Sequence, residues 1–146
     1  MEKKIGLYIC KGCGIGAAVD VDKLANSVKK MPVCKTHDVL CSPEGLQMIK
    51  GDMSSEGVNT LVIAACSPRV KFAEFDFPGS LVERVNIREF VAWTLDPMSD
   101  ASKSAAEDYI KTLQDTVKSL ETGLTELVDH PGNSKLAAIL RPSLTA

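Results

Sequence analysis

The chain is 146 residues long, with 45% hydrophobic and 25% charged residues, which is typical of one ordinary globular domain with its own core. Its net charge of −2 gives no electrostatic reason to expect nucleic acid or an anionic membrane surface as a partner. No apolar stretch approaches the roughly 18 residues that span a bilayer, and the first residues lack the apolar segment of a signal peptide. We therefore expect a cytoplasmic protein without direct membrane insertion.

Strand and helix signals alternate along the first hundred residues, which is typical of an α/β domain with a mostly parallel sheet. Residues 5–10, IGLYIC, are a short apolar run that predicts the first strand. Residues 20–31 carry apolar side chains at spacings of 3, 4 and 3, which predicts an amphipathic helix. Residues 33–41 predict the second strand, and a helix-like segment follows it as far as the breaker cluster at 54–57.

The third strand signal, LVIAAC at residues 61–66, is apolar without alternation, as expected for a strand covered on both faces at the centre of a sheet. Residues 81–87 predict a fourth strand, and the segment from Asn86 is expected to open a short helix that holds Trp93 in the core. We therefore expect a small three-layer Rossmann-like α/β domain over residues 1–100, with a mostly parallel sheet of about four strands.

A long C-terminal helix is predicted over residues 101–130. Its apolar positions recur at spacings of 3, 4, 3, 4 and 3, a heptad seam of little more than two repeats made by Ile110, Leu113, Val117, Leu120, Leu124 and Leu127. We expect this helix to pack on the domain's own sheet or to dock on a partner helix. Residues 131–146 are expected to form a loose tail.

The positions of the cysteines carry the most information about function. In a cytoplasmic protein, cysteines are more often ligands or catalytic thiols than disulfide partners. Cys10, Cys41 and Cys66 each close one predicted strand, and Cys13 follows Cys10 in a glycine-rich turn. Because the carboxyl ends of parallel strands share one edge, we expect these four thiols to converge there. Cys34 lies near the start of the second strand, so it is expected at the opposite edge as a spare, buried thiol.

Two of the cysteines are followed by Ser-Pro, at residues 42–43 and 67–68. This pair matches a helix N-cap followed by proline at the first helical position. Helix N-termini are therefore expected to face the cysteines, where their partial positive charge stabilises thiolates or a negatively charged cluster. Arg69 and Arg88 could offset the charge of such a cluster or face water, and we expect Arg88 to face water.

The opening stretch, YICKGCGIG, admits several interpretations. In Gly12-x-Gly14-x-x-Ala17, alanine replaces the third glycine of the dinucleotide-binding motif. A thioredoxin-like dithiol leaves Cys41 and Cys66 unexplained, and structural zinc sites usually use two Cys-x-x-Cys knuckles where this chain has one. Four converging thiolates, nearby glycines and an apolar shell favour an iron–sulfur cluster. Cysteines that are merely buried at strand ends remain an alternative.

Four blocks of the sequence, IGLYICKGCG, LCSPEGLQMIK, VNTLVIAACSPR and VNIREFVAW, together resemble the amino-terminal domain of the family of heterodisulfide reductase A-type subunits. The opening residues are most similar to the related flavoprotein subunits of the quinone-interacting membrane-bound oxidoreductase of sulfate reducers. The resemblance covers roughly residues 3–95. It implies an anaerobic redox protein with a [4Fe-4S] cluster as its metal-binding cofactor, whose ligands are Cys10, Cys13, Cys41 and Cys66.

The resemblance also implies a multi-subunit complex with flavoprotein and ferredoxin-like partners. Members of the family continue into a large flavin-binding domain, so FAD is expected on a partner and not on this chain. We expect an iron–sulfur electron-transfer subunit that relays single electrons to or from a flavoprotein and has no substrate-converting site of its own. The alternative is a cluster-free or zinc-bearing adaptor that assembles such a complex.

Overall fold

The computed structural model describes residues 3–27, 31–112 and 115. These residues contain a four-stranded parallel sheet in the order β2-β1-β3-β4, formed by β1 (Ile5–Cys10), β2 (Val33–His37), β3 (Thr60–Ala65) and β4 (Leu81–Asn86). The helices are α1 (Ile15–Ala18), α2 (Val21–Ser27), α3 (Pro43–Ser55), the π-helix η1 (Arg88–Ala92) and residues 100–112. The predicted α/β class with a parallel sheet of four strands is confirmed.

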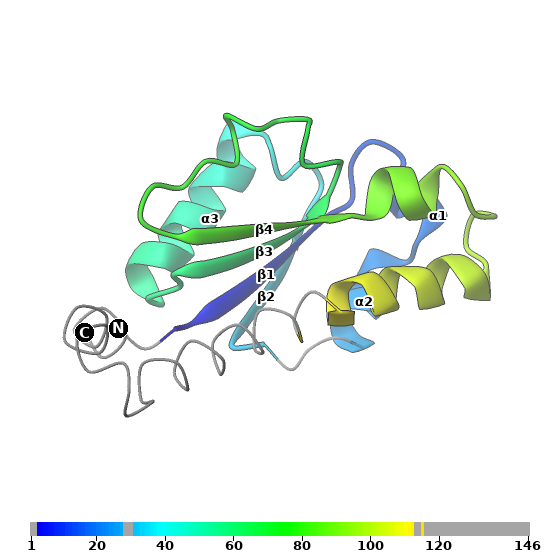
Figure 1. Ribbon diagram of the computed structural model, residues 1–146, viewed down its shortest axis with the longest axis horizontal. Coiled ribbons are helices and arrows are strands. Elements are labelled where there is room, and N and C mark those ends of the chain that lie inside the picture. The colour runs from blue at the N-terminus through cyan, green and yellow to red at the C-terminus, as the bar shows by residue number, and fades with distance from the viewer. Residues whose placement is uncertain (1–2, 28–30, 113–114, 116–146) are drawn as a thin grey trace, which may run out of the picture.

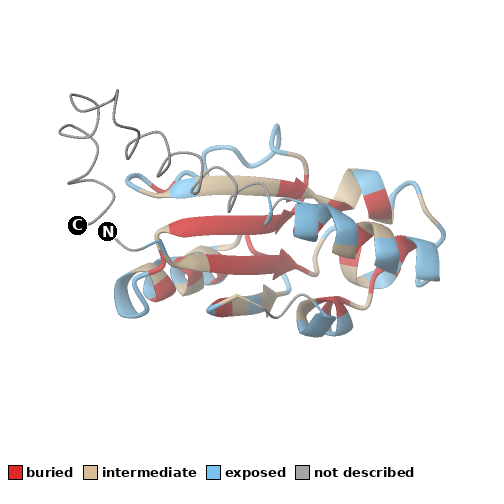
Figure 2. Ribbon diagram, turned by 60° about the horizontal axis from the view of Figure 1, so that its bottom comes forward, coloured by how far each residue is buried: buried red, intermediate tan, exposed pale blue. Residues whose placement is uncertain are grey.

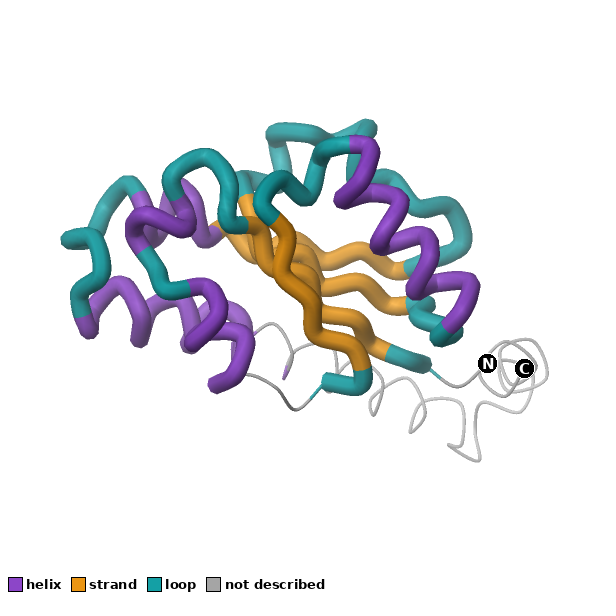
Figure 3. Tube along the Cα trace, turned by 180° about the vertical axis from the view of Figure 1, so that it is seen from behind, coloured by secondary structure: helices purple, strands orange, loops and turns teal. Residues whose placement is uncertain are grey.

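Helices lie on both sides of the sheet, so the domain has three layers. Helix α3 packs on one face, while α1, α2 and the helix of residues 100–112 lie on the other (Figure 1). Figure 3 shows the strands between these two groups from behind. Each parallel strand must be followed by a crossover to reach the same end of the sheet again. Helices supply the first two crossovers, α1 and α2 between β1 and β2 and α3 between β2 and β3, whereas turns connect β3 to β4.

The core lies around the two central strands. All six residues of β3 and five of the six residues of β1 are buried, as Figure 2 shows. Both strands are covered by helices on each face, which explains why their sequences are apolar without alternation. The prediction that residues 61–66 run through the centre of the sheet is confirmed.

The second strand is shorter than predicted, because it ends at His37 and not at Cys41. The backbone N–H of Val39 donates to Nδ1 of His37 at 3.1 Å, and the N–H of Ser42 donates to the carbonyl of Val39 at 3.0 Å. These bonds turn the chain between the strand and α3. Cys41 therefore sits in a turn four residues beyond the strand end, and it does not close the strand.

The predicted helix start at residues 67–68 is wrong, since residues 67–80 form turns. The N–H of Arg69 donates to Oγ of Ser67 at 3.3 Å, and the N–H of Val70 donates to the Ser67 carbonyl at 2.9 Å. A serine side chain that bonds a backbone N–H two residues ahead favours a turn over a helix. The Ser-Pro signal therefore marks a tight turn at this position.

The prediction that Trp93 lies in the core is also wrong, because 64% of this residue is exposed. Within η1 the buried residue is Val91, and Trp93 follows the last residue of the π-helix. Its ring instead lies under the guanidinium of Arg88, whose Cζ is 4.8 Å from the ring centroid.

The described part of the C-terminal helix, residues 100–112, packs on the rest of the domain. Ala106 and Ile110 are fully buried, and Oγ of Ser102 donates to the carbonyl of Ala18 at 3.2 Å. The rest of the predicted helix over 101–130, most of its heptad seam and the tail at 131–146 lie outside the described residues. Over the part of the chain that the structure describes, no helix is both long and apolar enough to cross a bilayer.

Candidate functional site

Four of the five cysteines line one small cavity at the carboxyl edge of the sheet. Cys10 is the last residue of β1, Cys66 directly follows β3, Cys13 lies in the turn before α1, and Cys41 lies in the turn before α3. The cavity that all four line has a volume of about 60 Å³. All five cysteines are free thiols, and the fifth, Cys34, does not line this cavity.

Cys34 lies near the start of β2, toward the other end of the sheet. It borders a separate cavity, together with residues 31–33, Lys35 and Glu56. Its thiol donates a long hydrogen bond of 3.8 Å to the carbonyl of Ala25. Cys34 is only partly buried, where the sequence predicted a buried thiol.

The turn after β1 brings its backbone against the first cysteine. A Cβ on Gly12 would lie 2.6 Å from the carbonyl oxygen of Asp38, so only glycine fits this position. The N–H of Gly12 donates to Sγ of Cys10 at 3.4 Å. Cys13 follows with a φ of 54°, a left-handed conformation that costs a non-glycine residue about 1 kcal/mol. Backbone strain of this kind concentrates at functional sites.

Helix α3 holds the turn that carries Cys41. Ser42 caps the helix by accepting from the N–H of Gly45 at 3.2 Å, and proline follows at the first helical position, as predicted. A Cβ on Gly45 would lie 2.5 Å from the carbonyl oxygen of Leu40. The first turn of α3 therefore packs directly on the segment before Cys41. The N-terminus of a 13-residue helix then contributes partial positive charge beside this thiol.

Arg84 contacts the thiol of Cys66, and sequence reasoning missed it. Its Nη2 lies 3.3 Å from Sγ of Cys66 and 3.2 Å from the carbonyl oxygen of the same residue. Burial lowers the pKa of Arg84, and the neighbouring Cys66 thiol opposes this shift. The sequence signal that could have found it is the charged pair Glu83-Arg84 between the apolar residues Val82 and Val85 of the strand.

Arg88 faces the cavity, which corrects the prediction that it faces water. Its side chain is 13% exposed and lines the same cavity as the four cysteines. Because β4 ends at Asn86 on the carboxyl edge, the first residue of η1 reaches the cysteines. Glu89 accepts from Arg88 Nη2 at 2.6 Å. This bond raises the pKa of Arg88, and the Cys13 thiol beside it adds to the effect.

The cavity combines closely spaced thiols with nearby cations. Burial raises the pKa of Cys10, the N–H groups of Leu40 and Gly12 oppose this shift, and the thiols of Cys13 and Cys41 add to it. Thiolates that line one cavity repel one another unless cations stabilise them, and metal binding releases the thiol protons. Within the described ranges, no three or more His, Cys, Asp or Glu side chains are placed to hold a single metal ion.

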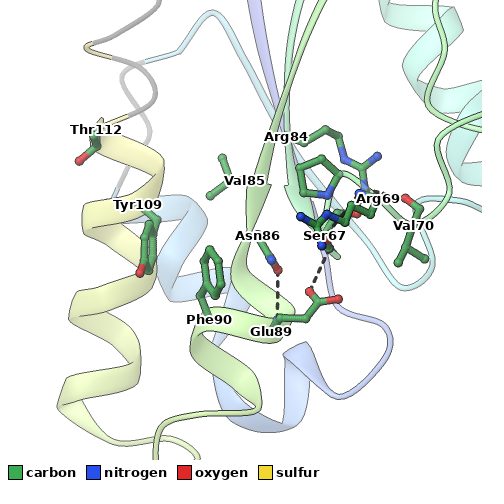
Figure 4. Close-up of a pocket in the computed structure, with 11 residues that line it drawn as sticks. Ser67, Arg69, Val70, Arg84, Val85, Asn86, Glu89, Phe90, Tyr109 and Thr112 are labelled. Carbon is green, nitrogen blue, oxygen red and sulfur yellow. Dashed lines mark hydrogen bonds between the residues drawn. The ribbon is translucent and has the colours of Figure 1, made fainter.

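A second, larger cavity of about 800 Å³ lies beside the first, and Val70 borders both. Figure 4 shows Phe90 and Tyr109 on one wall, with ring centroids 5.9 Å apart, and Arg84 on the other side. Between them, Glu89 accepts from the N–H of Ser67 at 2.9 Å (Figure 4). This bond ties η1 to the turn that follows Cys66.

Comparison with known proteins finds similarity to one group of redox subunits. The chain is 32% identical over 121 residues to the A-type subunit of the H(2):CoB-CoM heterodisulfide,ferredoxin reductase of Methanothermobacter marburgensis, a match that covers 75% of this chain and 18% of the relative. It is 30% identical over 140 residues to the second iron-sulfur A-type subunit of the CoB--CoM heterodisulfide reductase of Methanopyrus kandleri, covering 88% of this chain and 21% of the relative.

A third relative matches over fewer residues but with a higher sequence identity. Over 73 residues the chain is 40% identical to a protein of Archaeoglobus profundus that is named for its likeness to the heterodisulfide reductase A-type subunit, covering 47% of this chain and 10% of the relative. The chain thus spans about a fifth or less of the length of these curated relatives. No protein-family model matches the chain. The expected resemblance to heterodisulfide reductase A-type subunits is confirmed, while the finer likeness to the quinone-interacting oxidoreductase stays a prediction.

Proposed function

We propose that this chain is an electron-transfer domain of the kind found in heterodisulfide reductase A-type subunits, in which Cys10, Cys13, Cys41 and Cys66 bind one [4Fe-4S] cluster. The observation that carries the proposal is their common cavity. The first and last of these residues are 56 positions apart in the sequence, yet all four line one cavity of about 60 Å³. The name of the relative from Methanopyrus kandleri describes it as an iron-sulfur subunit, which agrees with thiolate ligands.

The shape of the site favours a cluster over a single zinc ion. Zinc lies about 2.3 Å from each thiolate, so its four sulfurs approach one another to about 3.8 Å and leave no space between them. The four cysteines here border an open space of about 60 Å³, and no three of the described His, Cys, Asp or Glu side chains are placed to hold a single ion. A cluster places its own iron and sulfide atoms between the cysteines, and it supplies one-electron chemistry when bound.

The chain's own residues provide the surroundings that such a cluster needs. The N–H of Gly12 donates to Sγ of Cys10, and hydrogen bonds of this type set the potential of a cluster. Lys71 and Arg88 line the cavity and offset negative charge, while the buried side chains of Ile15 and Phe75 border it and exclude water. Hydrogen bonds and apolar contacts around metal ligands orient them and tune the metal.

The four cysteines differ in exposure, which suggests where electrons enter and leave. Cys10 and Cys66 are buried, at 7% and 9% exposure, whereas Cys13 is exposed. In the proposal, a partner approaches on the side of Cys13. We propose that single electrons pass there to or from a flavoprotein that carries FAD, within a cytoplasmic complex that also contains ferredoxin-like subunits. Residues 1–100 form the cluster-binding domain in this account.

The test compares two cysteine variants of the full chain, purified without oxygen. The wild-type protein and Cys34→Ser are expected to hold four iron and four sulfide ions per chain, because Cys34 lies outside the cavity. Cys66→Ser is expected to lose most of the cluster and its visible absorbance. A colourless wild-type protein with one zinc per chain would show that the chain is a zinc-bearing adaptor. Equal loss of iron in both variants would contradict the assignment of ligands.

A further inference from the structure

Arg84 occupies an unusual place for a cation. It lies on β4, whose neighbour is the buried central strand β3, and the side chain is partly buried. The ring of Phe75, itself 4% exposed, covers the guanidinium with its centroid 4.3 Å from Cζ. Its Nε is buried and has no hydrogen-bond acceptor among the described residues. Keeping a charged group here is costly, so its remaining contacts need an explanation.

Those contacts converge on the turn that carries Cys66. Nη2 lies within 3.4 Å of the carbonyl oxygens of Cys66, Ser67 and Val70, and it is 3.3 Å from Sγ of Cys66. One amino group of a guanidinium has only two hydrogens, so these four acceptors share them. A neutral thiol is a weak acceptor, whereas a thiolate forms a stronger, charge-assisted bond. If Cys66 binds a metal centre as a thiolate, the hydrogen bonds of Arg84 would shift toward the sulfur.

The geometry points to Arg84 as a positioning residue that holds Cys66 at the cavity and raises the reduction potential of the bound cluster. This inference rests on the proposed function. A cluster that gains one electron becomes more negative, and a fixed cation with a donor on the ligand sulfur stabilises the reduced form more than the oxidised form. Hydrogen bonds to cluster sulfurs and the net charge near them are established determinants of potential.

Arg69 offers a matched control on the same turn. It is an arginine three residues after Cys66, but it is exposed and its backbone N–H, not its guanidinium, bonds Ser67. Removing its charge tests the general electrostatic effect of an arginine near the cluster. Removing Arg84 tests the direct contact with the ligand sulfur.

The experiment measures iron and sulfide content, and then the potential by an anaerobic redox titration followed by electron paramagnetic resonance. It uses the full chain as wild type, Arg84→Met, Arg84→Lys and Arg69→Met. We expect Arg84→Met to lower the equilibrium constant for reduction at least tenfold, which is 59 mV for a one-electron couple. Arg84→Lys keeps the charge without the planar fork, so its shift should be smaller, and Arg69→Met should shift less than half as much as Arg84→Met.

Each outcome decides something. Cluster-loaded Arg84→Met with the potential of wild type, or with the same shift as Arg69→Met, overturns the role of Arg84 and leaves the proposed function intact. If Arg84→Met does not retain the cluster, Arg84→Lys decides, because a lowered potential supports the inference and an unchanged one overturns it. A wild-type protein without a cluster overturns the proposed function, and this inference with it.

Discussion

The side chain of Asp52 ties α3 to the sheet, and its removal should destabilise the domain strongly. Asp52 is 5% exposed. It accepts from the hydroxyl of Tyr8 at 3.1 Å and from Nζ of Lys35 at 2.6 Å. Tyr8 lies on β1, two residues before Cys10, and Lys35 lies on β2. This small network therefore links both strands to the helix whose N-terminus holds the turn of Cys41.

The magnitude follows from the burial of each partner. Asp52→Ala leaves the hydroxyl of Tyr8, a residue with 0% exposure, without its acceptor, which costs about 1–3 kcal/mol. The ion pair adds less, since the side chain of Lys35 is 45% exposed and exposed pairs contribute about 0–1 kcal/mol. We expect Asp52→Ala to lower the free energy of unfolding by about 3 kcal/mol. Asp52→Asn keeps an acceptor for Tyr8 and should cost about 1 kcal/mol.

The assay is urea unfolding under reducing conditions, followed by circular dichroism, on samples with matched iron content. Tyr8→Phe and the double variant Tyr8→Phe/Asp52→Ala complete a double-mutant cycle. In the double variant no hydroxyl is left unpaired, so Asp52→Ala should cost less there than it does alone. Additive effects of the two substitutions, or a cost of Asp52→Ala below about 0.5 kcal/mol, would refute the reasoning.

Three further predictions concern the same helix and strand. Gly45→Ala should destabilise the domain by about 1–3 kcal/mol, because the added Cβ would lie 2.5 Å from the Leu40 carbonyl oxygen. Gly51→Ala on the same helix places its Cβ where nothing lies within 4 Å, so it should stabilise the domain by about 0.5–1 kcal/mol. The urea midpoints of the two variants should therefore lie on opposite sides of the wild-type midpoint. Ser42→Ala removes the helix cap and should cost about 1 kcal/mol in the same assay; an unchanged midpoint would contradict that role. Burial, and then the Asp52 carboxylate, raise the pKa of Tyr8 in the folded state. The free energy of unfolding that the protonated hydroxyl contributes is fully present below the unfolded pKa of about 10 and is lost as the pH rises above it. Tyr8→Phe should therefore show a shallower alkaline decrease in the free energy of unfolding than wild type, and parallel pH profiles of the two proteins would contradict this.

The order of elements and the core could be predicted from the sequence because the apolar runs are strong local signals. Residues 5–10 and 61–66 are apolar without alternation, and both became central, buried strands. Once the sheet is known to be parallel, the strand ends must share an edge. The gathering of Cys10 and Cys66 at that edge follows from this topology without any knowledge of side-chain contacts.

The missed features depend on contacts between segments that are far apart in the sequence. Ser67-Pro68 matches a helix start locally, yet Arg84 and Glu89 bind backbone groups of that turn from β4 and η1. The local sequence places Arg88 in water, because nothing in it shows that β4 ends beside the cysteines. Tertiary partners of this kind override local signals, and a single sequence does not reveal them.

The central claim is that four cysteines hold one cluster of four irons and four sulfides, and native mass spectrometry of the anaerobically purified wild-type chain tests it most directly. We expect a species heavier than the polypeptide by the mass of one [4Fe-4S] core, with four cysteine protons released. A chain that carries a single zinc ion, or one with the mass of the bare polypeptide after anaerobic reconstitution with iron and sulfide, would contradict it.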